Sequence, residues 1–447
     1  MLLRAIAGRE MHHQPGIVRS WLSALLAVAV LVMPCANVSP AWGADGSLVI
    51  AALHLLERTY VDPIQPVPLL NAAIATLRQA TNEGAGVLPD IAPGTPDARA
   101  DAQFVSEFVR AAQVSTLPEA QLAYAATEGM LLSLHDSHTY YLDPVALRES
   151  QRQLLGQPSF SGIGVTIASR KDAAGISWVF VENVFPGSPA ARAGIKRFDR
   201  LVSVDGQSLR NATALDASTL LRGPAGTTVS VTVQRRTQTL HVSVARAPIK
   251  VVPVETSFIA PGVAYITLFE FARGAGQQLR EELQRLRARS PIRGVILDLR
   301  GDAGGLVVEA ASVGGLFLPP HTVLARIHER DLVASAIETS GPPLFPQTPL
   351  VVLVDDGSAS ASEILAGAFK DYGRATIVGV KTAGALGGSV LVRLPEGGMS
   401  VTVERIVTPK SQRVEAVGIA PDVTVALTVA DMERGQDTQL QAALHAL

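Results

Sequence analysis

The spacing of hydrophobic residues first follows a helical period. In residues 47–61 and 119–134, apolar side chains recur three and four positions apart, which predicts amphipathic helices. Residues 82–101 between them are rich in Gly, Pro and Asp, and they predict a loop or an insertion. We therefore expect a mostly helical N-terminal region over residues 45–158.

The pattern then changes to short strands. The segments "GIGVTIA", "WVFVENV", "RLVSVDG" and "TVSVTVQR" alternate or run apolar, which predicts a small β domain over residues 159–247. The order of its parts, with "PGSPAARAGI" between the second and third strands, resembles a PDZ domain. Another small β-barrel is the alternative interpretation.

A PDZ domain binds an extended peptide as an added strand and holds the terminal carboxylate of the peptide on backbone N–H groups. The resemblance implies that the turn "SGIG" supplies these donors, with Ser161, Gly162, Ile163 and Gly164 as peptide-binding residues. Glycine suits such a turn because it lets a carboxylate approach the backbone closely.

From residue 251 to residue 428, strands and helices alternate. Buried strands such as "IRGVILDLR" and "PLVVLVDDG" are followed by segments with helical spacing, which predicts an α/β layer with a mainly parallel sheet. We assign residues 248–430 to this core and residues 431–447 to a C-terminal helix or tail. The predicted fold class is α/β and multi-domain, with a helical region, a PDZ-like β domain and an α/β core.

The first 44 residues are typical of a secretory signal peptide. Arg19 precedes an apolar run over residues 21–33, and small residues follow near positions 41–44. The run is short for a membrane span, although an uncleaved membrane anchor is the alternative. We predict an exported protein, periplasmic or extracellular, that associates with a membrane only if this segment is uncleaved. The only cysteine, Cys35, lies here, so the mature chain would have no disulfide, thiolate metal site or cysteine nucleophile.

Composition narrows the function further. Of the 447 residues, 47% are hydrophobic and 17% charged, which is typical of a globular chain. The formal net charge of -2 argues against nucleic acid as the main partner. We predict no cofactor and no metal site.

A serine-rich turn is the first candidate for chemistry. In "VVLVDDGSASASEI" an apolar strand ends and small residues lead directly into a helix. A serine at such a turn is held exposed, and the helix N-terminus behind it stabilises developing negative charge. Spacing alone does not separate Ser358, Ser360 and Ser362, and serine is also a favoured helix N-cap.

A second strand ends in "DLRGDAGGLV". Two loops at the carboxyl ends of neighbouring strands are where an α/β protein places a site. The backbone N–H groups of Gly304 and Ala361 would then form an oxyanion hole, in which one donor is worth about 3–4 kcal/mol.

A PDZ domain followed by "DLRGDAGG", "SASASEI" and "GIAPDV" resembles the C-terminal processing, or tail-specific, serine peptidases over roughly residues 120–425. The resemblance implies an α/β peptidase core, Ser360 as the nucleophile, Gly304 in the oxyanion hole, and protein or peptide substrates with free C-termini. Two residues depart from the pattern: Asp302 stands where the family has Asn, and Ala385 where it has a Lys general base. An alanine methyl cannot accept a proton.

The base must therefore lie elsewhere. Lys381 and Lys370 are the nearest lysines, but Lys381 lies four residues before the required position, at the end of a strand. Its use would require that strand to be rebuilt.

Ser137, His138 and Glu415 offer another base. "SH" upstream and "VEAVGIAPDV" near the C-terminus resemble the tricorn core peptidases, which use a histidine base oriented by a glutamate. In this interpretation His138 takes the proton of Ser360, while Glu415 and Ser137 fix its tautomer. A structural role for His138, tying the helical region to the core, stays open.

These observations predict a serine endopeptidase whose PDZ domain captures chain ends. Two alternatives remain. One is an inactive pseudopeptidase that binds peptides, which Ala385 favours. The other is a ligand-binding module like the retinoid-binding modules that share the core fold, and the PDZ insertion argues against it.

Overall fold

The computed structural model describes residues 46–136, 138–148, 161–249, 252–330 and 335–447. The predicted signal peptide with Cys35, and the predicted site residue Ser137, lie outside the described residues. Within the described ranges, no helix is both long enough and apolar enough to cross a membrane.

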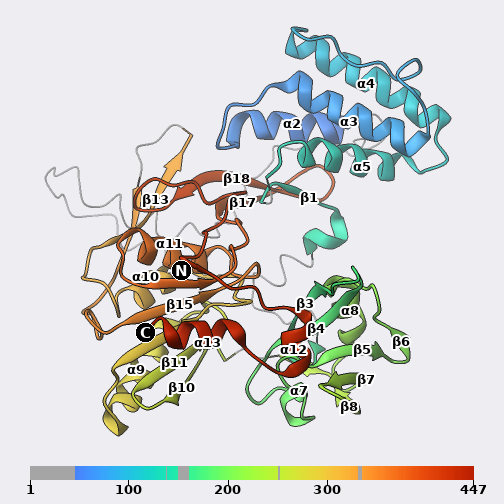
Figure 1. Cartoon of the computed structure of the whole chain (residues 1–447). Helices are drawn as coiled ribbons and strands as arrows, with labels where there is room; N and C mark the ends of the chain where they lie inside the picture. Colours follow the sequence, from blue (N-terminus) through green and yellow to red (C-terminus); the bar gives the residue numbers. More distant parts are fainter. Residues whose placement is uncertain (1–45, 137, 149–160, 250–251, 331–334) are drawn as a thin grey trace, which may run out of the picture.

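The N-terminal region is a helical domain (Figure 1). Its core includes Leu53 and Phe104, and it continues onto Met399 and Val401 of the C-terminal half of the chain. The predicted loop is shorter than expected, because α4 already begins at Asp97, directly after a proline in extended conformation. The helices are α2 (Ser47–Thr59), α3 (Pro66–Thr81), α4 (Asp97–Val114) and α5 (Glu119–Leu132).

The second domain is a sheet of strand order β3-β4-β5-β7-β8 with β6 beside β5, and it packs on two short helices. Strand β3 is an edge of this sheet, and α8 contacts it. The elements are β2 (Ser161–Gly162), β3 (Val165–Lys171), β4 (Ser177–Val184), α7 (Pro189–Arg192), β5 (Arg200–Val204), β6 (Gln207–Ser208), α8 (Ala214–Leu221), β7 (Thr228–Arg235), β8 (Gln238–Ala245) and β9 (Ala247–Pro248).

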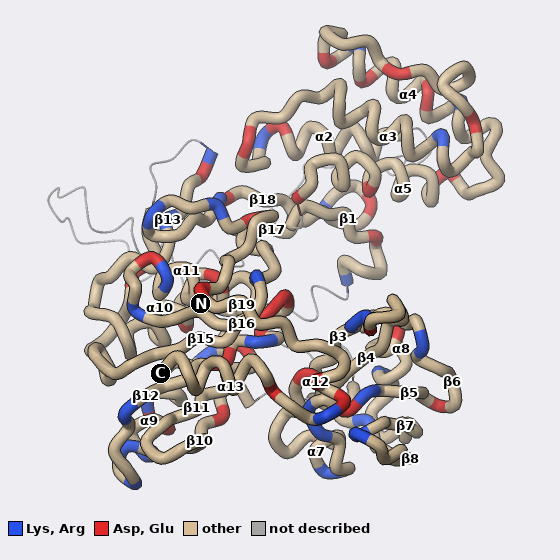
Figure 2. Tube along the Cα trace, viewed as in Figure 1, with Lys and Arg blue, Asp and Glu red and all other residues tan. Residues whose placement is uncertain are grey.

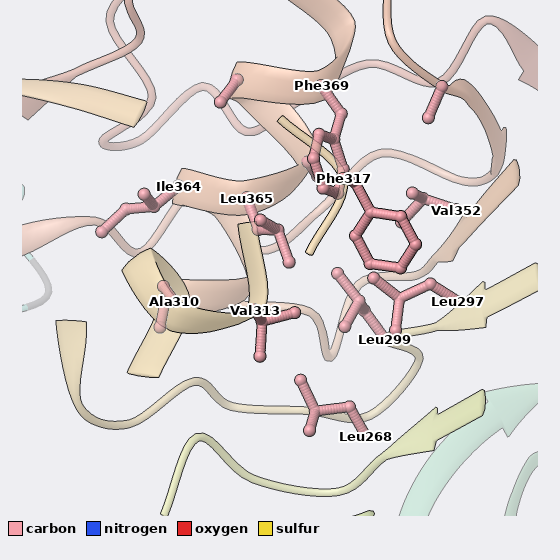
Figure 3. Close-up of a cluster of buried hydrophobic side chains, with 14 of the residues drawn as sticks. Leu268, Leu297, Leu299, Ala310, Val313, Phe317, Val352, Ile364, Leu365 and Phe369 are labelled. Atoms are coloured by element: carbon pink, nitrogen blue, oxygen red, sulfur yellow. The ribbon is translucent and has the colours of Figure 1, made fainter. Parts of the chain in front are cut away.

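The core is a six-stranded sheet of order β10-β11-β12-β15-β16-β19. Only β10 and β11 are antiparallel, which confirms the predicted mainly parallel sheet. Phe317 and Phe369 meet edge to face between helices and sheet, 5.9 Å between centroids (Figure 3). The elements are β10 (Val254–Ala260), β11 (Val263–Leu268), α9 (Ala275–Arg289), β12 (Gly294–Asp298), α10 (Val307–Gly314), β15 (Leu350–Val354), α11 (Ala361–Asp371), β16 (Thr376–Gly379) and β19 (Val423–Thr424).

A second, antiparallel sheet was not predicted. It has the order β1-β18-β13-β14, with β17 also paired to β18. Strand β1 comes from the end of the helical region, so this sheet brings residues near position 138 to the core. Its strands are β1 (Tyr140–Leu142), β13 (Val323–Glu329), β14 (Ser335–Glu338), β17 (Gly387–Arg393) and β18 (Gly398–Val407).

The C-terminal helices α12 (Val429–Arg434) and α13 (Thr438–His445) run from the second domain back across the core. Acidic and basic residues lie close together along this connection (Figure 2). Arg200 of β5 bonds Glu433 at 2.5 Å, and the buried Arg300 bonds Asp437 at 2.8 Å. Ion pairs therefore link the C-terminal segment to both domains.

Candidate active site

The serine-rich turn lies where the sequence predicts it, between β15 and α11. Strands β12 and β15 are parallel neighbours, so the turn and the "GDAGG" segment meet at the same edge of the sheet. Ser360 has φ 53° and ψ -114°, a backbone conformation that is strained for a residue with a side chain. Such strain is a feature of a nucleophile turn between strand and helix.

The structure separates the three serines that spacing leaves equivalent. Ser358 is fully buried, and its hydroxyl donates to the carbonyl of Leu299 at 2.7 Å. Ser362 is also fully buried and donates to the carbonyl of Asp302 at 3.1 Å. Ser360 is half-buried. Its neighbours therefore brace the two turns against each other, while Ser360 has the accessibility that a nucleophile needs.

Residues 382–386 pass directly beside Ser360. The Ser360 amide donates to the carbonyl of Ala385 at 3.0 Å. Glu363 is fully buried and accepts from the amides of Ser360 and Ala385, at 3.1 and 2.9 Å, and from the Thr382 hydroxyl at 2.5 Å. Burial raises the pKa of Glu363, and these hydrogen bonds oppose the shift. Through these hydrogen bonds, Glu363 holds residues 382–386 against the start of α11.

The same segment bonds Glu415 and leads to Gly387, which lies beside His138. The Leu386 amide donates to Glu415 Oε2 at 2.7 Å, and His138 Nδ1 lies 3.5 Å from that oxygen. A β-carbon built on Gly387 would lie 3.2 Å from His138 Nδ1, so the ring packs against this backbone. The structure thus brings the predicted His138 and Glu415 together, beside the segment that contacts Ser360.

The surroundings of His138 favour its charged form. The hydrogen bond to Glu415 raises the pKa of His138, burial opposes this, and the charges of Asp136 and Glu363 add to the rise. The chain around the ring is also fixed: the His138 amide donates to Asp136 Oδ1 at 2.9 Å. The Thr402 amide donates to the Thr139 hydroxyl at 3.0 Å, which anchors this stretch on β18.

The predicted oxyanion donors lie next to each other. A β-carbon built on Gly304 would be 2.8 Å from both the Ala361 nitrogen and Ser360 Cβ, so only glycine fits here, and its φ is +99°. Ala361 is the first residue of α11, and its N–H is one that a helix leaves without an internal acceptor. The Gly304 N–H already donates to Asp302 Oδ1 at 2.8 Å. Its role as an oxyanion donor thus stays a prediction.

The surroundings of the two lysines argue against either of them as the missing family base. Lys370 Nζ donates to the carbonyl of Ala420 and to Asp422, each at 2.7 Å, so it is committed to structural contacts. Lys381 is exposed.

Sequence reasoning missed Glu363 and Thr382, although one signal was available. Ser360 and Glu363 stand three residues apart before an apolar helix, which is the spacing of a capping box. No comparable local pattern marks Thr382, whose contact with Glu363 spans 19 positions.

The PDZ domain contacts the nucleophile turn through Arg170 on β3. Arg170 bonds Asp356 and Glu182, each at 2.8 Å. Burial and the charge of Asp355 raise the pKa of Glu182 to about 7. In the predicted "SGIG" turn, Gly164 has φ +82°, and the carbonyl of Ile163 accepts from Ala190 at 2.8 Å. Strand β3 begins directly after this turn.

Comparisons with known proteins define the class. The model of peptidase family S41 matches residues 262–425, and that of the PDZ domain matches residues 180–235. A carboxyl-terminal-processing protease of Picosynechococcus sp. is 36% identical over 334 residues, covering 73% of this chain and 79% of the relative. The corresponding protease of Bartonella bacilliformis is 29% identical over 344 residues, covering 75% and 77%. The chain is therefore a serine peptidase with a PDZ domain. It belongs to the carboxyl-terminal-processing protease family.

Solved structures agree on the fold. The photosystem II D1 C-terminal processing protease has a TM-score of 0.53 and 27% identity, covering 86% of this chain and 93% of its own. A putative S41 protease from Bacteroides fragilis has a TM-score of 0.56 at 17% identity, covering 92% and 97%. The predicted multi-domain α/β architecture is confirmed.

Proposed function

We propose that this peptidase cleaves protein substrates near their C-termini by acyl transfer to Ser360, with His138 as the general base. The observation that carries the proposal is the position of His138: its ring contacts Glu415 and Gly387, and the adjoining Ala385 carbonyl accepts the Ser360 amide. These contacts link a histidine and its carboxylate partner to the strained serine turn.

The chemistry follows from these groups. Neutral His138 takes the hydroxyl proton as Ser360 attacks the peptide carbonyl, and the resulting imidazolium returns a proton to the leaving amine. Glu415 orients the ring through Nδ1 and stabilises its charge. The N–H of Ala361 stabilises the oxyanion at the start of α11, and the Gly304 N–H joins it when it turns from Asp302 Oδ1 to the substrate. Water then hydrolyses the acyl-enzyme.

In this proposal the PDZ domain binds the C-terminal end of the substrate. An extended peptide adds to the edge of β3, and its carboxylate binds the amides of Ser161–Gly164. Because Arg170 of the same strand bonds Asp356 in the nucleophile turn, occupation of this edge is positioned to influence the site. We also propose that the protein is exported.

Labelling with a fluorophosphonate tests the nucleophile, because only an activated serine reacts quickly. Ser360→Ala should abolish labelling and casein cleavage, whereas Ser358→Ala and Ser362→Ala are matched controls that should keep most of both when folded. The hydroxyls of Ser358 and Ser362 are buried and hydrogen-bonded, so their removal can lower stability. A thermal unfolding curve should therefore be measured to show that each control variant is folded. Labelling that survives in Ser360→Ala would contradict the assignment.

Peptide binding tests the PDZ assignment. An apolar C-terminal peptide should bind the full-length Ser360→Ala protein at micromolar affinity, about -8 kcal/mol. The same peptide with an amidated C-terminus should bind much more weakly, since it lacks the charge that the turn donors contact. Equal binding of acid and amide would refute carboxylate capture.

One observation favours a second function. Ala385 removes the family's lysine, so an inactive protein that only binds peptides is the alternative. A wild type that resists labelling, together with an Ala385→Lys variant that becomes labelled, would establish this alternative.

A further inference from the structure

Asp302 lies where the two turns of the site meet. Its side chain is completely enclosed. Its backbone carbonyl accepts from the Ala359 amide at 3.0 Å and from the Ser362 hydroxyl at 3.1 Å, on either side of Ser360. Its Oδ1 accepts from the Gly304 amide at 2.8 Å. One residue therefore joins the serine turn to the glycine turn.

The other carboxyl oxygen of Asp302, Oδ2, does not join the two turns. Within the described residues, Oδ2 is buried and has no hydrogen-bond partner. Burial raises the pKa of Asp302 well above its usual range; the Gly304 amide and the Ser362 hydroxyl oppose this, and the charge of Glu270 adds to it. An ionised carboxylate in such a place costs several kcal/mol unless a cation compensates for it.

Charged groups on the turns beside Asp302 have partners of their own. Arg300, two residues away, bonds Asp298 at 2.6 Å. Asp355 accepts the amide of Gly301 at 2.8 Å, and Glu363 bonds the segment beyond Ser360. Among the described residues, Asp302 has no ion pair. Its surroundings therefore favour the neutral acid.

We propose that Asp302 is a positioning residue that works only while it holds a proton. The inference rests on the proposed function of Ser360. The neutral acid presents a carbonyl oxygen to the Gly304 amide, as the carboxamide of the family's usual Asn would, and adds no charge. Ionised Asp302 would place an anion behind Gly304 and Ala361, where the reaction develops negative charge, and would slow acylation. Asp302 thus sets an upper pH limit on activity.

Stability gives a test that does not depend on catalysis. An aspartate in the unfolded chain ionises near pH 4, while folded Asp302 keeps its proton to higher pH. Between the pKa of the unfolded chain and that of the folded chain, only the native state holds this proton. The stability that the proton contributes is therefore lost as pH rises through this range. Asp302→Asn carries no such proton, and its Tm relative to wild type should therefore increase with pH above about 4. A pH-independent Tm difference would refute a protonated Asp302.

Activity gives the second test. The rate of fluorophosphonate labelling of wild type, measured from about pH 6 to 10, should fall at the alkaline end. Asp302→Asn should stay within about threefold of wild type at neutral pH and lose this fall. Glu270→Gln, which leaves Asp302 in place, should move the fall to lower pH, because Asp302 ionises more easily without that charge. Glu255 is exposed, so Glu255→Gln is the control, and its labelling rate should have the same pH profile as that of wild type.

Two outcomes would overturn the proposal while leaving Ser360 as nucleophile. One is the same alkaline fall in Asp302→Asn; the other is a wild type without any fall up to about pH 10. A wild type that is not labelled at any pH would instead contradict the proposed function, and with it a catalytic effect of Asp302. The Tm series would then still decide whether Asp302 holds its proton.

Discussion

The nucleophile half and the base half of the candidate site are built differently. The residues of the nucleophile half are local: Ser360, its turn and Glu363 lie within one short stretch, which the hydroxyls of Ser358 and Ser362 fix to the neighbouring glycine turn. The base half joins His138, the Ala385 segment and Glu415 from three separate parts of the sequence. If His138 is the base, a local motif has stayed intact while the residue that activates it has changed position.

The two halves also differ in their exposure. Ser358, Ser362 and Glu363 are fully buried, whereas the side chains of His138 and Glu415 are 23% and 13% exposed. The contact between them is 3.5 Å long. We therefore expect mutations in the base half to change activity and its pH dependence more than they change folding.

The largest effect should come from removing the base. His138→Ala and His138→Gln should lower kcat/KM at least about 10³-fold, comparable to losing the base of a catalytic triad. In wild type, kcat/KM should rise with pH as His138 loses its proton, reach a plateau, and fall again only at the alkaline end, where Asp302 ionises. Because Glu415 raises the pKa of His138, this rise should be centred above the ordinary histidine pKa of about 6.5.

His54→Ala is the matched control for this experiment. His54 also contacts a carboxylate, Asp101 at 2.9 Å, but it lies in the helical domain. It should keep full activity. If His138 only ties the helical region to the core, His138→Gln would lower Tm but keep its labelling rate per folded molecule, and that result would remove His138 from the mechanism.

A smaller effect is expected from Glu415→Gln. The glutamine can still accept the Leu386 amide but carries no charge, so kcat/KM should fall about 10- to 100-fold, less than when the base is lost. The acidic limb of the pH profile should move to lower pH, since the main cause of the raised pKa of His138 is gone. Exposed Glu119→Gln is the control. If the acidic limb of the pH profile does not move in Glu415→Gln, Glu415 does not act on His138.

The pH dependence of Tm should also reveal the interaction between His138 and Glu415. A raised folded pKa means that the pair stabilises the protein below the unfolded pKa of His138, and that this contribution disappears as pH rises through the folded pKa. The Tm difference between wild type and Glu415→Gln should therefore narrow with rising pH.

The contrast between the halves also explains what the sequence could predict. Alternating strands and helices predicted the parallel sheet, and the strand–turn–helix pattern predicted the position of the Ser360 turn, because both depend on neighbouring residues. The antiparallel sheet around β18 was missed, since β1 and β13 pair with β18 across large sequence separations. Thr382 was missed for the same reason: only the folded chain brings it to Glu363. The proposed pairing of His138 with Glu415 came from a resemblance, and no spacing rule yields it.

The smallest effect should come from restoring the family's lysine. Ala385 is half-exposed, and its amide and carbonyl bond Glu363 and Ser360, contacts that a lysine backbone would keep. Ala385→Lys should therefore fold normally. Its ammonium would disfavour the imidazolium of His138, so the acidic limb should move to lower pH, and kcat/KM should change by less than about tenfold. Ala385→Met, which has a long side chain without charge, separates this charge effect from bulk and should leave the limb in place. A large gain of activity in Ala385→Lys that persists when His138 is replaced would mean that the nucleophile half still responds to a lysine base. The base half described here would then have no part in the chemistry.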